Sequence, residues 1–123
     1  MTQIATSIRQ VLTDAASSRP DDIWLVAPET ETSFSWAETQ KRAETIACYL
    51  QGAGLSEGAS VAIAAPNGAA ASFAFLGVVY GGFRATPLNL VAGAKTLSFV
   101  LSHSKTEIIL CAVPLEFLIT LSI

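Results

Sequence analysis

The sequence has few charged residues. Only 14% of its 123 residues are Asp, Glu, Lys or Arg and 51% are hydrophobic, whereas about 25% are charged in an average soluble protein. So few charges cannot cover the whole outside of one small domain, and we expect some apolar surface to meet another domain or a membrane. The net charge of −3 and the scattered Lys and Arg residues provide no basic stripe. This argues against a nucleic-acid partner.

Side chains that bind metal ions are also scarce. His103 is the only histidine, which excludes a site built from several histidines; we interpret it as a capping or dipole partner near a helix C-terminus. Cys48 and Cys111 are far apart, and both lie among apolar residues. Residues 1–10 lack the charged-then-apolar order of a secretory signal. We therefore expect two buried, reduced thiols and a cytoplasmic location rather than a disulfide.

No hydrophobic run reaches the length of a membrane span. Residues 68–83 and 108–123 are each about sixteen residues long, whereas a spanning helix needs about twenty. The second run also contains Pro114 and Glu116. We predict no membrane span and interpret the first run as a buried core helix. Association of residues 108–123 with a membrane stays open as a lesser alternative.

The pattern of apolar residues predicts helices and strands in alternation. A first helix ends at Pro20, and its apolar residues recur at helical spacing: Ile4, Ile8, Val11, Leu12 and Ala15. The later elements are a strand at 22–28, an extended piece at Phe34, a helix after Ser35, a strand at 60–66, a helix at 68–81, a strand at 83–88, a helix at 92–103 and a strand at 106–112. Strands separated by helices imply βαβ units. We predict an α/β fold with parallel strands and helical crossovers.

Polar residues and glycines indicate where the helices begin and end. Ser35 and Glu38 form an S-x-x-E capping box, in which the hydroxyl and the carboxylate each satisfy a backbone amide. Asn67 is placed to cap the next helix. Gly52 or Gly54 can end the helix that follows Ser35, because glycine adopts the left-handed conformation without a Cβ penalty.

The glycines of the segment GAGLSEG, residues 52–58, are similar to those of a phosphate-binding loop, but the order of the elements is wrong. A dinucleotide fingerprint is G-x-G-x-x-G between a strand and a helix. Here the spacing is G-x-G-x-x-x-G, and the segment leads from a helix into a strand. Its amides would lie at a helix C-terminus, where the dipole repels an anion. We interpret the segment as a turn.

No other pattern carries a reaction by itself. The sequence contains no G-x-x-x-x-G-K-[ST] loop and no G-x-S-x-G nucleophile elbow. The acidic pairs at 21–22 and at 29 and 31 are interpreted as solvated turn residues. Asn67 and Asn89 each follow a strand, at the carboxyl edge where open α/β sheets bind ligands, although helix capping explains Asn67. We assign no catalytic, cofactor-binding or metal-binding residue.

Several short motifs follow one another in a fixed order. The first motif, Phe34 to Thr39, opens a long helix, and the second, Gly54 to Ala62, forms a turn and a strand. The third, Pro66-Asn67, ends that strand. The fourth runs from Gly82 to Asn89 and ends with the residues P-L-N. Together they resemble the N-terminal region of the adenylate-forming superfamily: acyl- and aryl-CoA synthetases, luciferases and peptide-synthetase adenylation domains. The resemblance covers residues 18–112, and the P-L-N form is most similar to CoA ligases.

The resemblance implies the first subdomain of the N-terminal domain of such enzymes, over residues 1–112. It also implies the family reaction, ATP-dependent activation of a carboxylic acid to an acyl-adenylate followed by thioester formation with CoA, usually with Mg²⁺. The family's phosphate loop ending in P-K, its ribose-binding Asp and its catalytic Lys have no counterpart in this sequence. We therefore expect no cofactor for this chain. ATP, Mg²⁺, CoA and the carboxylic acid substrate belong to the full-length family.

The sequence also departs from the family pattern. Ala59 stands where the family has an acid, and Phe83 stands where it has a small residue. Residues 113–123 form an apolar tail that departs from the family pattern, as a truncation or frameshift would produce. We expect an open sheet edge beside 60–66 and 106–112, and marginal stability as a consequence.

Two functional hypotheses follow. The first is a fragment of an ATP-dependent acid–CoA ligase without catalytic activity alone. The second is a small non-catalytic binding or interaction module that uses its apolar surface, with self-association as one outcome.

Overall fold

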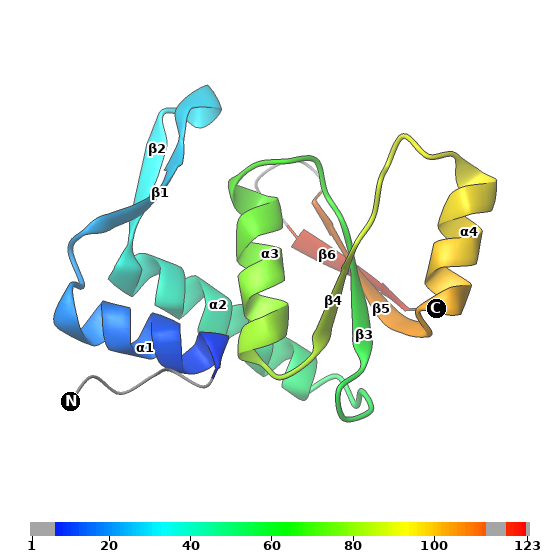
Figure 1. Cartoon of the computed structure of the whole chain (residues 1–123), viewed down its shortest axis with the longest axis horizontal. Helices are drawn as coiled ribbons and strands as arrows, with labels where there is room; N and C mark the ends of the chain where they lie inside the picture. The colour runs from blue at the N-terminus through cyan, green and yellow to red at the C-terminus, as the bar shows by residue number, and fades with distance from the viewer. Residues whose placement is uncertain (1–6, 113–117, 123) are drawn as a thin grey trace.

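The computed structural model describes residues 7–112 and 118–122, with only the backbone described for Ala112 and residues 118–122. Within this part of the chain, two strands form a small sheet of their own and four strands form a second sheet (Figure 1). Ile4, predicted on the apolar face of the first helix, lies outside the described residues, as do residues 113–117 of the predicted tail.

The first helix, α1 (Ile8–Ser18), begins and ends at polar residues. The Ser7 hydroxyl accepts a hydrogen bond from the Gln10 amide at 3.1 Å and so caps the N-terminus. The helix ends before Pro20, as predicted. Its buried residues, Leu12 and Ala15, recur at helical spacing, and Leu12 packs with Ala43 and Ala47 of α2.

The two strands that follow α1 pair with each other and not with the main sheet. β1 (Ile23–Ala27) runs antiparallel to β2 (Thr32–Ser35), and the short 3₁₀ helix η1 (Pro28–Thr30) connects them. The alternation of elements did not indicate this separate hairpin. Phe34 anchors it to the rest of the chain through an edge-to-face contact with the Phe73 ring, 4.9 Å between centroids.

The capping box at Ser35 starts α2 (Trp36–Gln51). The Glu38 amide donates to the Ser35 hydroxyl at 3.2 Å, as predicted. The Glu38 carboxylate accepts from that same hydroxyl, at 3.2 Å, where the prediction had it accept from the Ser35 amide. Downstream, the side-chain amide of Gln40 donates to the Tyr80 hydroxyl at 3.0 Å and so connects α2 to α3.

The main sheet is parallel in three of its four strands. In order across the sheet, the strands are β4 (Arg84–Pro87), β3 (Ser60–Ala64), β5 (Thr106–Ala112) and β6 (Leu118–Ser122). β3 is parallel to both β4 and β5, and β6 runs antiparallel to β5. The crossovers are α3 (Ala69–Tyr80) and α4 (Ala94–His103), which lie on opposite sides of the sheet (Figure 1). The α/β prediction is confirmed.

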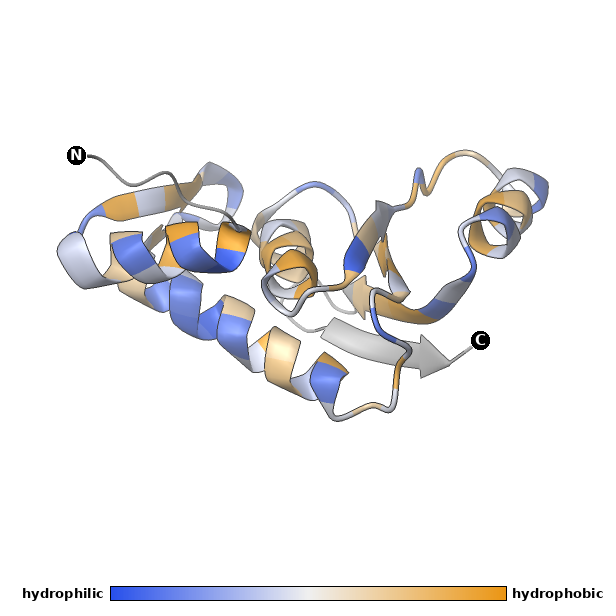
Figure 2. Cartoon of the chain, turned by 60° about the horizontal axis from the view of Figure 1, so that its bottom comes forward, coloured by the Kyte–Doolittle hydropathy of each residue, from blue (hydrophilic) through white to orange (hydrophobic). Residues whose placement is uncertain are grey.

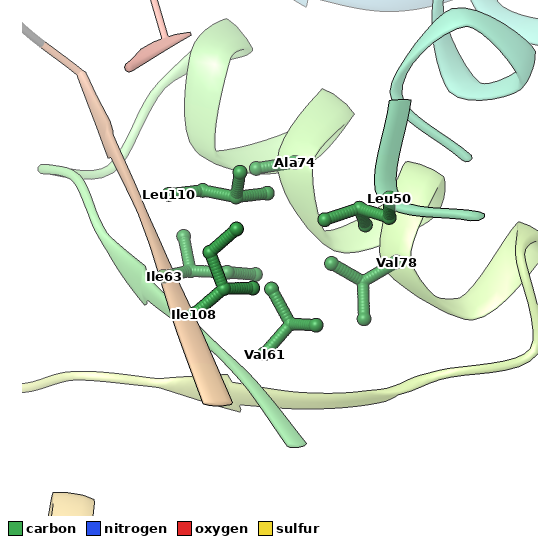
Figure 3. Close-up of a cluster of buried hydrophobic side chains, with 7 residues drawn as sticks. All are labelled: Leu50, Val61, Ile63, Ala74, Val78, Ile108 and Leu110. Carbon is green, nitrogen blue, oxygen red and sulfur yellow. The ribbon is translucent and has the colours of Figure 1, made fainter. Parts of the chain in front are cut away.

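The core lies between the sheet and the α2–α3 pair. Side chains from β3, β5, α2 and α3 meet there (Figure 3): Leu50, Val61, Ile63, Ala74, Val78, Ile108 and Leu110. Because successive residues of a strand point to opposite faces, Val61 and Ile63 supply the β3 part of this core. On the other face, α4 contributes no buried residue, and Leu97, Val100 and Leu101 are only half-buried.

The predicted open edge beside 60–66 and 106–112 is wrong. β3 lies in the middle of the sheet, and β6 pairs with the outer side of β5. On the edge strand β4, the amides of Arg84 and Leu88 donate to Ala59 and Ile63 of the β3 segment, at 2.9 and 3.0 Å. The backbone nitrogens of the alternate residues, including Pro87, therefore point away from β3 toward the open side of β4. Since proline has no N–H, it removes a donor from this edge and opposes further strand pairing.

Candidate functional site

A cleft lies at the carboxyl ends of β3 and β4, beside the N-terminal half of α3. Its volume is about 650 Å³, within the range of about 300–1,000 Å³ that is typical of ligand pockets. Its walls are mostly apolar: Phe75 comes from α3, Leu88 follows β4, and Trp24 reaches the cleft from the hairpin. The cleft occupies the edge at which parallel α/β sheets bind ligands.

The two asparagines predicted at this edge have different surroundings. Asn67 lines the cleft. Asn89 is not among the residues that line it; its side-chain oxygen accepts from the Val91 amide at 3.2 Å and so closes a local turn. Only Asn67 is therefore placed to contact a molecule in the cleft.

The prediction that Asn67 caps α3 is wrong. The N-cap residue is Gly68, and no side chain bonds to the first amides there. The backbone oxygen of Gly68 instead accepts from both the amide and the hydroxyl of Ser72, each at 3.1 Å. Because the helix starts one residue later than predicted, the side chain of Asn67 belongs to the cleft and not to the helix terminus.

The glycine segment at 52–58 is a turn, and the polar groups of Ser56 within it are already paired. Gly52 ends α2 in a right-handed conformation, while Gly54 and Gly58 take positive φ values of 75° and 67°. The Ser56 amide and hydroxyl donate to the Glu107 carboxylate at 3.1 and 3.3 Å. A phosphate here would meet that carboxylate, so these residues do not fit the phosphates of ATP.

The cysteines are free thiols, but the prediction that both are buried is wrong for Cys48. Cys48 is exposed, because α2 buries the face formed by Ala43, Ala47 and Leu50. Cys111 is half-buried on β5, and burial raises the pKa of its thiol.

The remaining candidates lie at the surface. His103 is the last residue of α4, where the sequence placed it, and its ring stacks on Phe99 with centroids 5.4 Å apart. The acidic residues at 21–22, 29 and 31 are exposed in turns or at their ends. Among the described residues, no three His, Cys, Asp or Glu side chains gather closely enough to hold a metal ion. None of the described helices is both long and apolar enough to cross a membrane.

A comparison with known protein families identifies the family of this chain. The profile of a family described as AMP-binding enzyme matches residues 12–120. The chain belongs to this family. The match includes α2, the whole parallel sheet and the cleft, and it extends past residue 112 into β6.

Curated relatives of the chain include acid–CoA ligases. It is 24% identical over 107 residues to a sulfoacetate–CoA ligase from Cupriavidus necator, a match that covers 87% of the chain and 21% of the relative. It is 29% identical over 89 residues to the long-chain-fatty-acid–CoA ligase FadD13 of Mycobacterium tuberculosis, covering 72% of the chain and 18% of the relative. The chain therefore spans about a fifth of the length of these relatives.

Solved structures of N-terminal domains have the same fold as this chain. The N-terminal domain of FACL13 from Mycobacterium tuberculosis superimposes with a TM-score of 0.80 at 27% identity, over 87% of this chain and 27% of that domain. The N-terminal subdomain of NpsA from Klebsiella oxytoca has a TM-score of 0.74 at 19% identity, over 82% of this chain and 26% of that one, and supports the fold alone. The chain corresponds to the N-terminal portion of such a fold.

Sequence motifs indicated the edge of the sheet at which the cleft lies, but not its walls. Its walls come from the hairpin, from the end of β3 with the start of α3, and from the end of β4. No spacing pattern links segments that are tens of residues apart, so only the tertiary arrangement brings Trp24, Phe75 and Leu88 together. The Pro-Asn and Pro-Leu-Asn motifs were its one local signal.

Proposed function

We propose that the chain is the N-terminal scaffold portion of an acid–CoA ligase, and that these 123 residues alone do not activate a carboxylic acid. The observation that carries the proposal is the family match over residues 12–120 in a chain that spans about a fifth of its relatives. In the full-length family, ATP, Mg²⁺ and CoA take part, and the substrate is a carboxylic acid.

The chemistry of adenylation supports inactivity of the isolated chain. Transfer of an adenylyl group requires donors and cations that stabilise charge on the phosphates. The sequence has no Gly-rich loop ending in Pro-Lys, and its one glycine-rich turn places the Glu107 carboxylate where a phosphate would sit. The α2–α3 pair and the sheet supply a framework and no reacting group.

The test is an acid-dependent ATP–pyrophosphate exchange assay on the purified chain. The panel contains acetate, butyrate, a long-chain fatty acid and sulfoacetate, with Mg²⁺ and ATP throughout. We expect exchange equal to that of a blank without protein, while a full-length ligase such as FadD13 serves as the positive control with the fatty acid. Exchange above the blank with any acid contradicts the proposed inactivity.

Exposed apolar residues favour a second candidate, a non-catalytic interaction module. Val91 is 91% exposed and Phe99 is 65% exposed, and exposed apolar side chains mark contact sites where they form a contiguous patch. This function predicts a soluble chain of defined oligomeric state that unfolds in one cooperative step. Aggregation on size exclusion, or a broad thermal transition, contradicts it.

A further inference from the structure

The walls of the cleft present aromatic and aliphatic side chains to a bound molecule. Trp24 and Phe75 line the cleft and are 37% and 43% exposed, although aromatic side chains of this size usually bury most of their surface. Pro87 and Leu88 line it from the end of β4. With a volume of about 650 Å³, the cleft has room for a bicyclic aromatic molecule.

The walls of the cleft are uncharged. Among the described residues, no Asp, Glu, Lys or Arg side chain lines the cleft. The apolar character continues past Leu88, since Figure 2 colours the connection from β4 to α4 mostly as hydrophobic. An ion that left water for this cleft would lose hydration without gaining a charged partner among the lining side chains. The walls therefore favour an uncharged ligand.

A carboxylate lies at the rim of the cleft, beside the start of α3. Oε1 of Glu29 lies 3.6 Å from the place where a Cβ on Gly68 would stand, and Gly68 lines the cleft. The N-terminus of a helix ordinarily attracts an anion. Here the charge of Glu29 already occupies that place, and it repels the carboxylate of a ligand. Glu29 is thus placed to discriminate against acids.

Asn67 offers the cleft an uncommitted polar side chain. It lines the cleft, is exposed and does not cap α3. Ser72 lines the cleft too, but its hydroxyl already donates to the Gly68 backbone oxygen at 3.1 Å. A side-chain amide both donates and accepts hydrogen bonds. Asn67 is therefore complementary to a carboxamide on the ligand, which donates and accepts in the same way.

We propose that the cleft binds an uncharged bicyclic aromatic molecule that carries a carboxamide. Trp24 and Phe75 contact its rings, and Asn67 forms hydrogen bonds with its amide. Glu29 excludes the acid of the same shape. The inference goes beyond the proposed function, because such a ligand has no carboxylate to activate.

The test is an NMR titration of the isotope-labelled 123-residue chain at neutral pH, with 2-naphthamide and with 2-naphthoate, the anion of the same shape. We expect 2-naphthamide to bind one to one and to shift the signals of the Trp24 indole and of the Gly68 and Ser72 amides, but not those of α4. We expect 2-naphthoate to bind at least about tenfold more weakly. Equal or tighter binding of 2-naphthoate or of 2-naphthylmethylammonium, or shifts spread over the whole surface, would overturn the proposal.

Two substitutions test the contacts with the ligand. Asn67→Ala should weaken the binding of 2-naphthamide roughly fivefold and leave that of 2-ethylnaphthalene, which lacks the amide, unchanged. Phe75→Ala should weaken the binding of both molecules roughly tenfold. The matched control is Phe99→Ala, which removes an exposed ring from α4, on the other side of the sheet, and should not change binding. Thermal melts verify that each variant is folded. Equal effects of Phe75→Ala and Phe99→Ala, or an equal loss of both molecules in Asn67→Ala, contradict the proposed contacts.

A third substitution tests the exclusion of acids. Glu29→Gln should strengthen the binding of 2-naphthoate and leave that of 2-naphthamide unchanged, so the difference between the two narrows. Glu57→Gln removes the same charge from the exposed turn at the amino edge of the sheet and should leave the difference as it is. The role of Glu29 is refuted if the difference does not narrow, or if Glu57→Gln narrows it equally. None of these outcomes depends on the ATP–pyrophosphate exchange assay.

Discussion

The contact of Gly77 in α3 with α2 should not tolerate a single added methyl group. Gly77 is buried in α3, and a Cβ built on it would lie 2.5 Å from both Cβ and Cγ2 of Ile46 and 3.3 Å from the Ala43 carbonyl oxygen. Carbon atoms in good contact are about 3.5–4.0 Å apart. The Cβ of Ile46 is fixed to the α2 backbone, so it cannot rotate away. The helices must therefore separate to accommodate Gly77→Ala.

Two opposing terms set the size of the effect. Replacing glycine by alanine within a helix stabilises it by about 1 kcal/mol when space permits. Forcing an extra methyl group into a packed core costs about 1–3 kcal/mol, and a clash with backbone-fixed atoms belongs at the upper end. We expect Gly77→Ala to lower the free energy of unfolding by about 1–2 kcal/mol. In a chain of this size that lowers the Tm by roughly 4 °C or more.

The assay is thermal and urea unfolding followed by circular dichroism, with Gly52→Ala as the matched control. Gly52 ends α2 with a φ of −83°, and its added Cβ would meet only backbone oxygens at 3.6 and 3.7 Å. Because this is ordinary contact in a permitted conformation, Gly52→Ala should leave the Tm unchanged or slightly raised. A Gly77→Ala variant that melts at or above the unsubstituted chain would refute the packing argument.

Three further predictions concern polar groups and thiols. Thr39→Val should raise the free energy of unfolding by about 1 kcal/mol, since the buried Thr39 hydroxyl has no hydrogen-bond partner to lose; a lower Tm would contradict this. Ser35→Ala should lower the free energy of unfolding by about 1 kcal/mol, because α2 loses its N-terminal cap; urea unfolding measures the change. Iodoacetamide at pH 8 should alkylate Cys48 faster than Cys111, because burial shields the Cys111 thiol and raises its pKa; peptide mass spectrometry gives both rates.

The raised pKa of the Cys111 thiol also predicts how the free energy of unfolding changes with pH. A thiol whose pKa is raised by folding keeps its proton to higher pH in the folded chain than in the unfolded chain. Cys111 therefore has no effect on stability well below the ordinary thiol range. Above that range the unfolded chain loses the proton first, so stability should fall as the pH rises through the folded pKa.

Local patterns sufficed for most of the fold. The apolar run at 60–66 predicted a strand, and β3 is buried along most of its length, as is typical of a strand covered on both faces. The S-x-x-E motif located the start of α2 because a capping box depends only on residues three apart. Elements whose signals lie within a few residues of one another are those that sequence reasoning recovered.

Features that depend on distant partners were missed. The pairing of β1 with β2 separates them from the main sheet, and nothing in their own residues distinguishes this from membership in it. The segment 118–122 looked like part of an apolar tail, yet it pairs with β5 and closes the edge that was expected to be open. The exposure of Cys48 depends on which face of α2 meets α3, which its apolar neighbours in sequence did not reveal.

The two edges of the sheet differ in a way that bears on function. At the amino edge, hydroxyls of Thr86, Ser60, Thr106 and Ser104 form a chain of hydrogen bonds across three strands, at 2.7, 3.1 and 2.7 Å. Glu107 and the 52–58 turn complete this edge, so its polar groups bond to one another. At the carboxyl edge, apolar side chains remain uncovered around the cleft. Hydrogen bonds among these side chains thus stabilise the amino edge, whereas the carboxyl edge keeps exposed apolar side chains, which is consistent with the scaffold role that we propose.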